Sequence, residues 1–417
     1  MSFLKNSSIY LGAEIINKSI PFLLLPIFTQ YLTPSDYGII ASFNSFVAFT
    51  SIFIGLSVQG AINVNFFKYT KDKLKIYIVN AILLLVITTI IVFFIVFTFE
   101  TQISEKLYLD NQWLYIGVII AFAQFISLLN LTLWIAEKRP KEYSLYQISQ
   151  TIVTAMITLS LVVAYNLGWT GQLISIIITS LSFSLLSLYL LFKREYFTFK
   201  YEKESMNDLL KFGIPLIPHT LSGWIITSGD KILLLIMVGA SATGLFTIGY
   251  QISMIMGVLV TSFHKVWNPY IYEKLSLKEI DIKIKIKIVK FTYLYFILII
   301  ILVFFLNEMA KYIFLVLLAK EYTDSYKFVI YILISFGFNG MYFMVVSYIF
   351  FMHKTKELAK ITFSSAILHI ILSYTFISLY GSIGVAYSGI MSYFIMFILV
   401  WRLSHKVYPM PWLFWRY

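Results

Sequence analysis

The chain has 417 residues, of which 59% are hydrophobic and only 12% are charged. Soluble domains carry about 25% charged residues, so this composition excludes an ordinary soluble domain and indicates an integral membrane protein. The sequence contains no cysteine, which excludes disulfides, thiolate metal sites and cysteine nucleophiles, and its net charge is +12.

Twelve apolar runs are long enough to cross a membrane, because about 20 apolar residues span the hydrocarbon core. The first run carries Glu14 and Lys18 and no small-residue cleavage site follows it, so we expect a retained spanning helix rather than a signal peptide. The run 312–319 is too short to span and is expected at the membrane interface. The twelve runs lie near 9–32, 37–61, 76–99, 113–136, 145–166, 169–192, 212–238, 243–263, 288–306, 326–351, 358–379 and 382–403.

The basic residues predict the orientation of these spans. With the N-terminus in the cytoplasm, 26 of the 32 Lys and Arg residues fall on the cytoplasmic side and four fall outside. Cytoplasmic loops carry the basic excess, so both termini are expected in the cytoplasm. The charge then faces anionic lipid headgroups, and no nucleic-acid partner is expected. The basic segment 278–291 is expected to form a helix on the membrane surface, with an isolated strand as the alternative.

The two halves of the chain resemble each other. The stretch 31–44 matches 237–250 with Gly38 over Gly244, and the glycines of 168–171 match those of 381–384. An even number of spans in each half makes the repeat parallel, as in many transporters. We therefore predict an all-α integral membrane protein with twelve transmembrane helices in two pseudo-symmetric six-helix lobes around a central cavity. The lobes are expected at 1–204, which includes a cytoplasmic linker, and at 205–417.

Several stretches resemble one protein family. They are LLLPIFTQYLTPSDYGIIASFNSF (23–46), EKRPKEYSLYQIS (137–149), SGDKILLLIMVGASATGLFTIGYQIS (228–253) and the spaced glycines GWTG and GSIG. With these stretches the chain resembles the Wzx-type polysaccharide flippases of the multidrug/oligosaccharidyl-lipid/polysaccharide (MOP) exporter superfamily, over nearly its whole length.

The resemblance implies a function in the bacterial cytoplasmic (inner) membrane. Wzx-type proteins move undecaprenyl-diphosphate-linked oligosaccharide repeat units, of the O-antigen or capsule type, from the cytoplasmic to the outer leaflet by alternating access. The expected partners are therefore this lipid-linked oligosaccharide, membrane lipids, and the polymerase and chain-length proteins of the same pathway. One chain holds both lobes, so a functional monomer is expected. Related lipid II flippases carry several cavity arginines, whereas Arg402 at the edge of the last span is the only arginine in the predicted spans here. Contacts to the diphosphate are therefore expected from lysines, helix N-termini or polar side chains.

Four charged residues lie well within the predicted spans: Glu14, Lys18, Asp230 and Lys231. Glu14 and Lys18 have the spacing of a helical ion pair. They either neutralise each other as structure, or Lys18 meets the lipid diphosphate on entry while Glu14 releases it or takes a proton.

Asp230 and Lys231 are adjacent, so they point in different directions on a helix and each needs its own partner. A charge in hydrocarbon is costly, and Gly229, Pro215 and Pro218 favour a broken helix here. His219 and Ser222 are expected near the helical face of Asp230, as a polar stripe along a wetted cavity wall. Protonation of Asp230 would free Lys231 to hold an anion, with H⁺ or Na⁺ as the coupling ion; the alternative is structural pairing between helices.

Further polar residues are candidates for the cavity: Asn44, Gln59, Asn63, Gln251 and Asn339. They would contact sugar hydroxyls, although hydrogen bonds between helices explain them equally simply. His369 is a lone histidine in the eleventh span and is expected to be satisfied by a neighbour.

Three other functions are alternatives. A membrane glycosyltransferase or acyltransferase is disfavoured because the sequence contains no D-x-D motif and no His followed by Asp five positions later. We therefore expect no enzyme activity, no catalytic residues, no metal site and no cofactor. A cation-coupled multidrug exporter of the same superfamily, or a flippase for lipid II or teichoic-type precursors, would share the fold.

Overall fold

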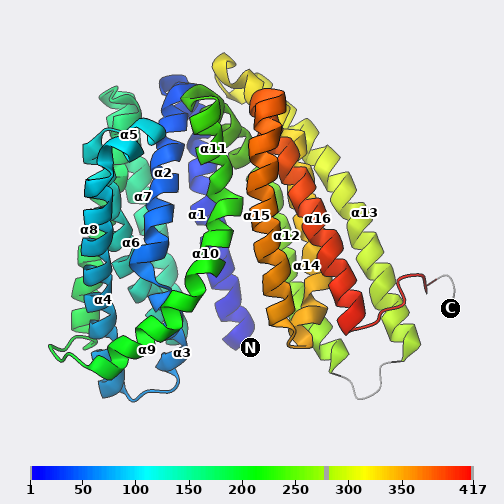
Figure 1. Cartoon of the computed structure of the whole chain (residues 1–417), viewed down its shortest axis with the longest axis horizontal. Helices are drawn as coiled ribbons and strands as arrows, with labels where there is room; N and C mark the ends of the chain where they lie inside the picture. The colour runs from blue at the N-terminus through cyan, green and yellow to red at the C-terminus, as the bar shows by residue number, and fades with distance from the viewer. Residues whose placement is uncertain (1, 277–280, 415–417) are drawn as a thin grey trace. The chain divides into compact units, whose positions relative to one another are not determined.

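The computed structural model describes residues 2–276 and 281–414, with side chains from Ile9 onward except that of Leu11. Every element in these ranges is a helix (Figure 1). Ten helical segments of the described residues are long and apolar enough to cross a membrane. The last of them, Thr355–Val407, contains two helices, and the first helix of the chain is not among the ten. The all-helical class is confirmed, whereas the number of twelve spans and the location of the termini stay predictions.

The chain forms two compact units, Met1–Trp224 and Ile225–Tyr417. The expected boundary at 204/205 stays a prediction, but the segment 203–224 packs with the N-terminal unit. The N-terminal unit contains α1 (Ser2–Tyr31), α2 (Pro34–Gly55), α3 (Val58–Phe66), α4 (Lys71–Thr98), α5 (Glu100–Leu107), α6 (Asn111–Ala136), α7 (Pro140–Thr158) with a π-helical extension (Leu159–Ala164), α8 (Gly168–Lys193), α9 (Lys203–Gly213), a 3₁₀ turn (Ile214–Leu216) and α10 (Ile217–Trp224).

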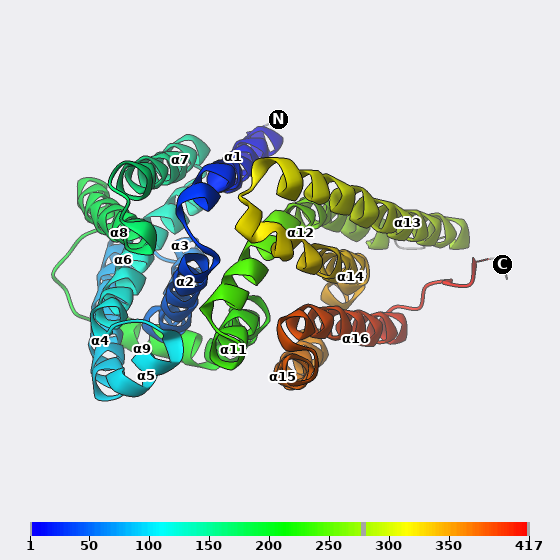
Figure 2. The same cartoon turned by 90° about the horizontal axis from the view of Figure 1, so that it is seen from above.

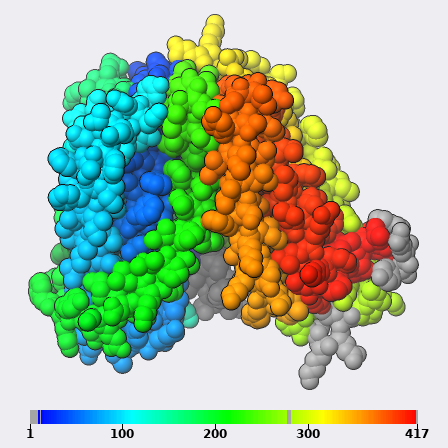
Figure 3. Space-filling view, in the orientation of Figure 1, coloured from blue at the N-terminus to red at the C-terminus, as the bar shows by residue number. Residues whose placement is uncertain are grey.

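The C-terminal unit begins inside the seventh predicted span. It contains a π-helix (Ile225–Gly229), α11 (Asp230–Met237), α12 (Ala240–Leu275), α13 (Ile282–Tyr312) with a π-helical end (Ile313–Leu317), a 3₁₀ segment (Lys320–Ser325), α14 (Tyr326–Phe351), α15 (Thr355–Tyr380), a 3₁₀ turn (Gly381–Ile383) and α16 (Gly384–Val407). Helices α15 and α16 pack side by side on the face of this unit seen in Figure 3.

The two units repeat one pattern of helix packing. In the N-terminal unit α6 packs against α2, α4 and α8, while α7 packs against α1 and α8. In the C-terminal unit α14 packs against α12, α13 and α16, while α15 packs against α11 and α16 (Figure 2). In chain order, α1, α2, α4, α6, α7 and α8 correspond to α11, α12, α13, α14, α15 and α16. The same pairs of helices therefore pack in both units, and the repeat in the sequence corresponds to a repeat in the tertiary packing.

The repeated glycines make the same turn in each unit. Gly168 and Gly381 have φ of +56° and +65°, which favours glycine because a side chain is strained there. Three residues later, a Cβ on Gly384 would lie 2.0 Å from the carbonyl oxygen of Phe376, and one on Gly171 would lie 3.1 Å from the backbone of Leu161. The first glycine therefore reverses the chain and the second lets the next helix approach closely.

The motif LTPSDYG is a helix start. The Thr33 hydroxyl accepts a hydrogen bond from the Asp36 N–H at 3.2 Å, and the Asp36 carboxylate accepts one from the Thr33 N–H at 2.8 Å. Pro34 occupies the first turn, where its missing N–H costs nothing. This capping box fixes the beginning of α2.

Two predicted segments differ from the structure. The run 37–61 is not one helix, because Leu56 and Ser57 adopt left-handed φ of 41° and 52° between α2 and α3. The strand alternative for 278–291 is wrong from Ile282 onward, where α13 is continuous with the following apolar helix, and residues 278–280 lie outside the described residues. The run 312–319 includes the π-helical end of the α13 segment.

Candidate functional site

The seventh apolar segment is broken at the position of its charges. A π-helix at Ile225–Gly229 ends where α11 begins, so Asp230 is the first residue of α11. A 3₁₀ turn at Ile214–Leu216, which contains Pro215, interrupts the same segment earlier. π-Helical turns insert an extra residue and frequently occur at functional sites. The break therefore presents Asp230 and Lys231 at an irregular point of the backbone.

Asp230 is held by two residues of α15. The His369 Nε2 atom lies 3.1 Å from the Asp230 Oδ1 atom, and the Ser373 hydroxyl donates a 2.8 Å hydrogen bond to the same oxygen. His369 and Ser373 are four residues apart, so both side chains project from one face of α15. The exposed fractions of the Asp230 and His369 side chains are 13% and 3%. Asp230 thus has a buried titratable partner from another helix.

A second layer of hydroxyls comes from α16. The Ser392 hydroxyl lies 2.9 Å from His369 Nδ1, and the Ser388 hydroxyl lies 2.8 Å from that of Ser373. The Nδ1 atom can accept a hydrogen bond from Ser392, whereas Nε2 is buried 3.1 Å from the Asp230 carboxylate without the geometry of a hydrogen bond. The α16 hydroxyls therefore fix one side of the His369 ring, and the carboxylate lies beside the other.

Lys231 points elsewhere. Its Nζ atom lies 5.0 Å from the centroid of the Tyr250 ring on α12. Among the described residues, no carboxylate forms an ion pair with Lys231, so this cation is held by an aromatic face. A cation without a counter-ion in hydrocarbon attracts an anionic ligand.

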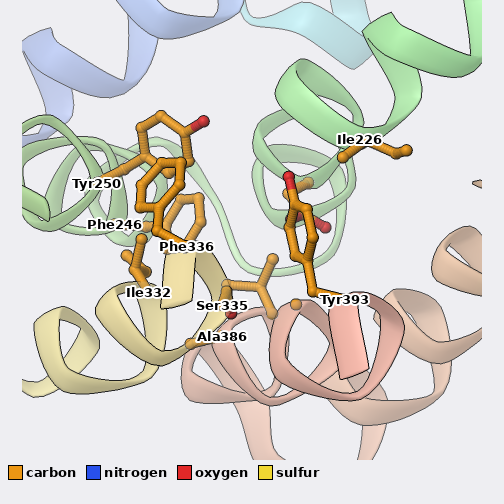
Figure 4. Close-up of a pocket in the computed structure, with 11 residues that line it drawn as sticks. Ile226, Phe246, Tyr250, Ile332, Ser335, Phe336, Ala386 and Tyr393 are labelled. Atoms are coloured by element: carbon orange, nitrogen blue, oxygen red, sulfur yellow. The ribbon is translucent and has the colours of Figure 1, made fainter. Parts of the chain in front are cut away.

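A small cavity reaches this site. Asp230 lines it together with Tyr250, Phe246 and Phe336 on one side and Ile226 and Tyr393 on the other (Figure 4). Its volume of about 30 Å³ is enough for a water molecule. An oligosaccharide does not fit this space, so the chemistry available beside Asp230 is that of water, a proton or a small ion.

The Glu14–Lys18 pair is present, as predicted. Lys18 Nζ donates to Glu14 Oε1 at 3.1 Å, with side-chain exposed fractions of 38% and 43%. Between them in the chain, Asn17 donates a 3.1 Å hydrogen bond to the Gln147 side-chain oxygen and accepts one of 3.1 Å from Thr151 on α7. The pair therefore flanks a neutral polar contact between α1 and α7.

The helix pairs α1–α7 and α11–α15 correspond in the repeat, and each carries a polar contact. Asn17 contacts Gln147 and Thr151, and Asp230 contacts His369 and Ser373, with each pair of partners spaced i and i+4. The α1–α7 contact is therefore made by neutral side chains, whereas the α11–α15 contact contains a carboxylate and an imidazole.

His219 and Ser222 belong to α10, in the other unit from Asp230. His219 is exposed, and the buried Ser222 hydroxyl donates to the Pro218 carbonyl at 2.7 Å. His219 and Ser222 were predicted to share a helical face with Asp230, on the assumption of one regular α-helix. The π-helix between α10 and α11 breaks that regular spacing. A polar stripe through these residues stays a prediction.

The predicted cavity amides are dispersed over both units. Asn44 on α2 and Asn63 on α3 are exposed, and the Gln59 side-chain oxygen is buried without a hydrogen-bond partner in the described structure. Gln251 on α12 and Asn339 on α14 are half-buried. Their contacts to a sugar stay predictions.

Sequence reasoning missed the residues that complete the Asp230 shell: Ser373, Ser388 and Ser392, and the partner role of His369. One signal could have found one of them. Aligning the halves on Gly168 and Gly381 places Ser175 over Ser388.

The helical fold and the buried charge in a broken helix define a polytopic membrane protein with the architecture of a transporter. Residues 3–274 match the family of polysaccharide biosynthesis proteins, so the chain belongs to that family. It is 26% identical over 377 residues to a membrane protein of Haemophilus influenzae, with 89% of each chain covered. It is 24% identical over 380 residues to a protein of the Lsg locus of Haemophilus influenzae, with 89% of this chain and 90% of the relative covered.

Solved structures share the fold. An inward-facing multidrug resistance MATE family transporter of the MOP superfamily matches with a TM-score of 0.74 and 13% identity, over 93% of this chain and 94% of that one. The lipid II flippase MurJ, in an inward closed conformation, matches with a TM-score of 0.72 and 14% identity, over 95% and 87%. A MOP superfamily transporter from Pyrococcus furiosus matches with a TM-score of 0.66 and 14% identity, over 96% and 95%. The predicted resemblance is confirmed at the level of the polysaccharide biosynthesis family, and these MOP superfamily transporters share the fold.

Proposed function

We propose that this protein is a flippase that moves a diphosphate-linked oligosaccharide, of the undecaprenyl type, from the cytoplasmic to the outer leaflet of the bacterial inner membrane by alternating access. Membership of the polysaccharide biosynthesis family supports the substrate class. The observation that carries the transport proposal is the buried Asp230–His369 pair beside a broken helix. Buried ionisable groups in membrane helices commonly mark ion or substrate pathways.

The proposed coupling ion is the proton. Asp230 and His369 are both ionisable groups, and the neighbouring cavity of about 30 Å³ has room for a water molecule that would deliver a proton. A hard cation such as Na⁺ prefers oxygen ligands, and at Asp230 Oδ1 it would compete with the imidazole 3.1 Å away. Protonation of Asp230 weakens its hold on His369 and Ser373, which changes the contact between α11 and α15.

The proposed role of Lys231 is to attract the lipid diphosphate. It has an aromatic partner and no acidic one among the described residues, so its charge is available to an anion. Lys18 pairs with Glu14 and would exchange that partner for the diphosphate on entry. Each of these lysines is thus proposed to exchange a weak partner for a stronger anion.

A multidrug exporter has the same fold, and so does a lipid II or teichoic-precursor flippase. The fold alone does not separate these functions, and the family match favours the polysaccharide branch. The proposal includes no enzymatic step, and the polymerase and chain-length proteins of the same pathway are its proposed partners.

The test is the leaflet that holds the lipid-linked intermediates. In a strain lacking the gene, completed units are expected on the cytoplasmic face of the inner membrane, inaccessible to an impermeant lectin or periodate in spheroplasts. Re-expression of the wild-type chain should restore accessibility. Units that reach the outer leaflet without the gene would contradict the proposal, and changed dye resistance with normal glycans would indicate a drug exporter.

A further inference from the structure

A second, larger cavity lies at one end of the C-terminal unit, away from Asp230. Its volume is about 620 Å³, within the range of small-molecule sites. It is formed where α13 ends, α14 begins, and α15 turns into α16, at the upper end of α15 in Figure 1. Its lining residues are Asn307, Tyr326, Lys327, Ile330, Tyr331, Tyr380, Ser382 and Ile383.

Three tyrosines line this cavity, two from the start of α14 and one from the end of α15. Tyr331 and Tyr380 both pack edge-on against Tyr387, with ring centroids 5.0 and 5.6 Å from it. Tyr326 is held from another side by Phe314, at 6.1 Å. A tyrosine belt at a membrane interface would face lipid, whereas these three rings border one cavity. They are fixed aromatic faces with hydroxyls, which suits a ligand with apolar C–H faces and a polar rim.

One polar atom in the cavity lacks a partner. Asn307 Nδ2 donates a 2.8 Å hydrogen bond to the Tyr326 hydroxyl, which fixes the orientation of the amide. Its Oδ1 atom is buried and accepts no hydrogen bond from the described residues. Buried polar atoms are normally satisfied, so an unused acceptor beside a cavity indicates a ligand or water that donates to it. A sugar hydroxyl is such a donor.

The charge of the cavity disfavours other ligands. Lys327 is exposed and its ammonium lies 3.8 Å from the Asp324 carboxylate, so the two charges nearly cancel. Of the two, only Lys327 lines the cavity. A cationic drug would meet this ammonium, and a lipid chain would bury the amide and hydroxyl groups without hydrogen bonds. A neutral or weakly acidic sugar leaves no such group unpaired.

We propose that this cavity is a saccharide-binding site, in which the tyrosine faces stack on the apolar faces of a sugar ring and Asn307 accepts a hydrogen bond from a hydroxyl. The inference rests on the proposed function, because the sugar is then the glycan of the lipid-linked substrate. On the orientation predicted from the basic residues, the cavity faces the outside, so it receives the glycan as the unit leaves.

The test measures binding of a free glycan to the full-length protein in nanodiscs. The probe is the oligosaccharide released by mild acid from the host strain's own lipid-linked intermediates, followed by saturation-transfer difference NMR. Saturation of ring C–H protons is expected on the wild-type protein. Tyr380→Ala and Asn307→Ala should each weaken binding by about three- to tenfold, the range of one aromatic or hydrogen-bond contact.

Two matched variants distinguish stacking from misfolding. Tyr380→Phe keeps the aromatic ring, so its affinity for the glycan should be within about twofold of the wild type. A twofold change in affinity is smaller than the change expected from losing an aromatic contact. Tyr374→Ala removes an equally exposed tyrosine of α15 that does not line the cavity, and should bind like the wild type. Tyr380 is 56% exposed, so its replacement is expected to leave the fold intact.

The outcomes separate this site from the proposed function. Unchanged transfer in Tyr380→Ala and Asn307→Ala would overturn the site, as would no glycan signal on a wild-type chain that restores flipping. Tyrosine-dependent glycan binding by a chain whose deletion leaves the units on the outer leaflet would support the site and contradict the flippase proposal.

Discussion

Asp230 has a partner that titrates, and this is the feature most open to a residue-scale test. Asp230→Asn keeps the size of the side chain but removes the charge that holds His369 at 3.1 Å. We expect the translocation rate to fall by more than about tenfold, because the buried His369 side chain then lacks its charged partner. The measurement is the rate at which lipid-linked units become accessible outside spheroplasts. Asp110→Asn, an exposed carboxylate that makes no capping hydrogen bond, is the control and should be silent.

His369→Gln extends the same test to pH. Glutamine can hydrogen-bond Asp230 or Ser392 but cannot carry a proton charge. Histidine is the side chain that titrates between about pH 5 and 8, so the variant should lose any pH dependence of translocation in that interval. A wild-type rate that depends on Na⁺ and not on pH would contradict proton coupling.

The stretch 137–149 includes a second charged cluster, which we interpret as structural. Arg194 lies 2.6 Å from the Glu137 carboxylate and donates to the Asn130 side-chain oxygen at 2.6 Å, and its guanidinium stacks over Trp134 at 5.3 Å. The Tyr196 hydroxyl donates to the other Glu137 oxygen at 2.6 Å. The side-chain exposed fractions of Arg194 and Glu137 are 14% and 15%, so removing either partner leaves a nearly buried charge.

We predict that Glu137→Gln lowers the free energy of unfolding by about 3 kcal/mol, as expected when one member of a buried ion pair is lost. Thermal unfolding in detergent is the measurement. The double variant Glu137→Gln/Arg194→Gln should cost less than the sum of the two single variants, since each single change already breaks the pair. Strict additivity would contradict this interpretation.

At the scale of elements, the close approach of α15 and α16 depends on a glycine. A Cβ at Gly384 would lie 2.0 Å from the Phe376 carbonyl oxygen, and a backbone atom cannot rotate away. Gly384→Ala should therefore destabilise the C-terminal unit by about 1–3 kcal/mol, the usual cost of overpacking. Gly12→Ala, with nothing within 4 Å, is the matched control and should be neutral or slightly stabilising. Equal melting temperatures for the two variants would contradict the packing argument.

The segment before α9 is tied to α4 by charge. Glu202 accepts a 2.6 Å hydrogen bond from Lys73, and this contact holds the pKa of the Glu202 carboxyl below its ordinary value. Because the pKa of Glu202 is lower in the folded than in the unfolded protein, the contact with Lys73 stabilises the folded state at pH values above the unfolded pKa of about 4.3. This stabilisation is lost as the pH falls through the pKa of the folded state.

We therefore expect the protection factors of amides in segment 196–213, which are corrected for the intrinsic exchange rate at each pH, to fall below about pH 4, more in the wild type than in Glu202→Gln. That variant already lacks the charge and should exchange faster at neutral pH. A segment equally protected at both pH values in the two proteins would contradict a role for the ion pair.

At the scale of the whole molecule, the absence of cysteine makes the predicted topology directly testable. Single cysteines at Gln102 and Thr323 should react with an impermeant maleimide added to intact spheroplasts. Cysteines at Ser276 and Lys354 should react only after the membrane is opened, because the basic loops are predicted in the cytoplasm. All four positions are exposed, so reactivity reports sidedness. Labelling of Ser276→Cys from outside would contradict the orientation, and with it the outward location of the saccharide cavity.

The repeated packing of the two units also belongs to this scale. The same pairs of helices pack in each unit, yet the α1–α7 contact contains the neutral Asn17–Gln147 hydrogen bond, whereas the α11–α15 contact contains the Asp230–His369 pair. The repeated scaffold therefore carries different polar groups between corresponding helices.

The sequence by itself determined the class of the fold, the two-part repeat and several local structures. Long apolar runs require helices in hydrocarbon, where backbone groups have no water to bond. The repeated Gly168 and Gly381 correspond to matching turns, and Gly229 beside Asp230 indicates a broken helix. Adjacent charges at 230 and 231 also required separate partners, because neighbours on a helix diverge.

Only the tertiary structure decided which partners these are. In a membrane helix both the buried and the lipid-facing sides are apolar, so periodicity does not reveal which face packs on which neighbour. His369 therefore was predicted only as a lone histidine satisfied by a neighbour, and the packing shows that this neighbour is Asp230. Only the packing brings the tyrosines at 326, 331 and 380 to one cavity. At the break between α2 and α3 the left-handed residues are Leu56 and Ser57, and not the adjacent Gly55. Contacts between distant helices depend on the whole packing arrangement, whereas turns, caps and spans depend on residues that are neighbours in the chain.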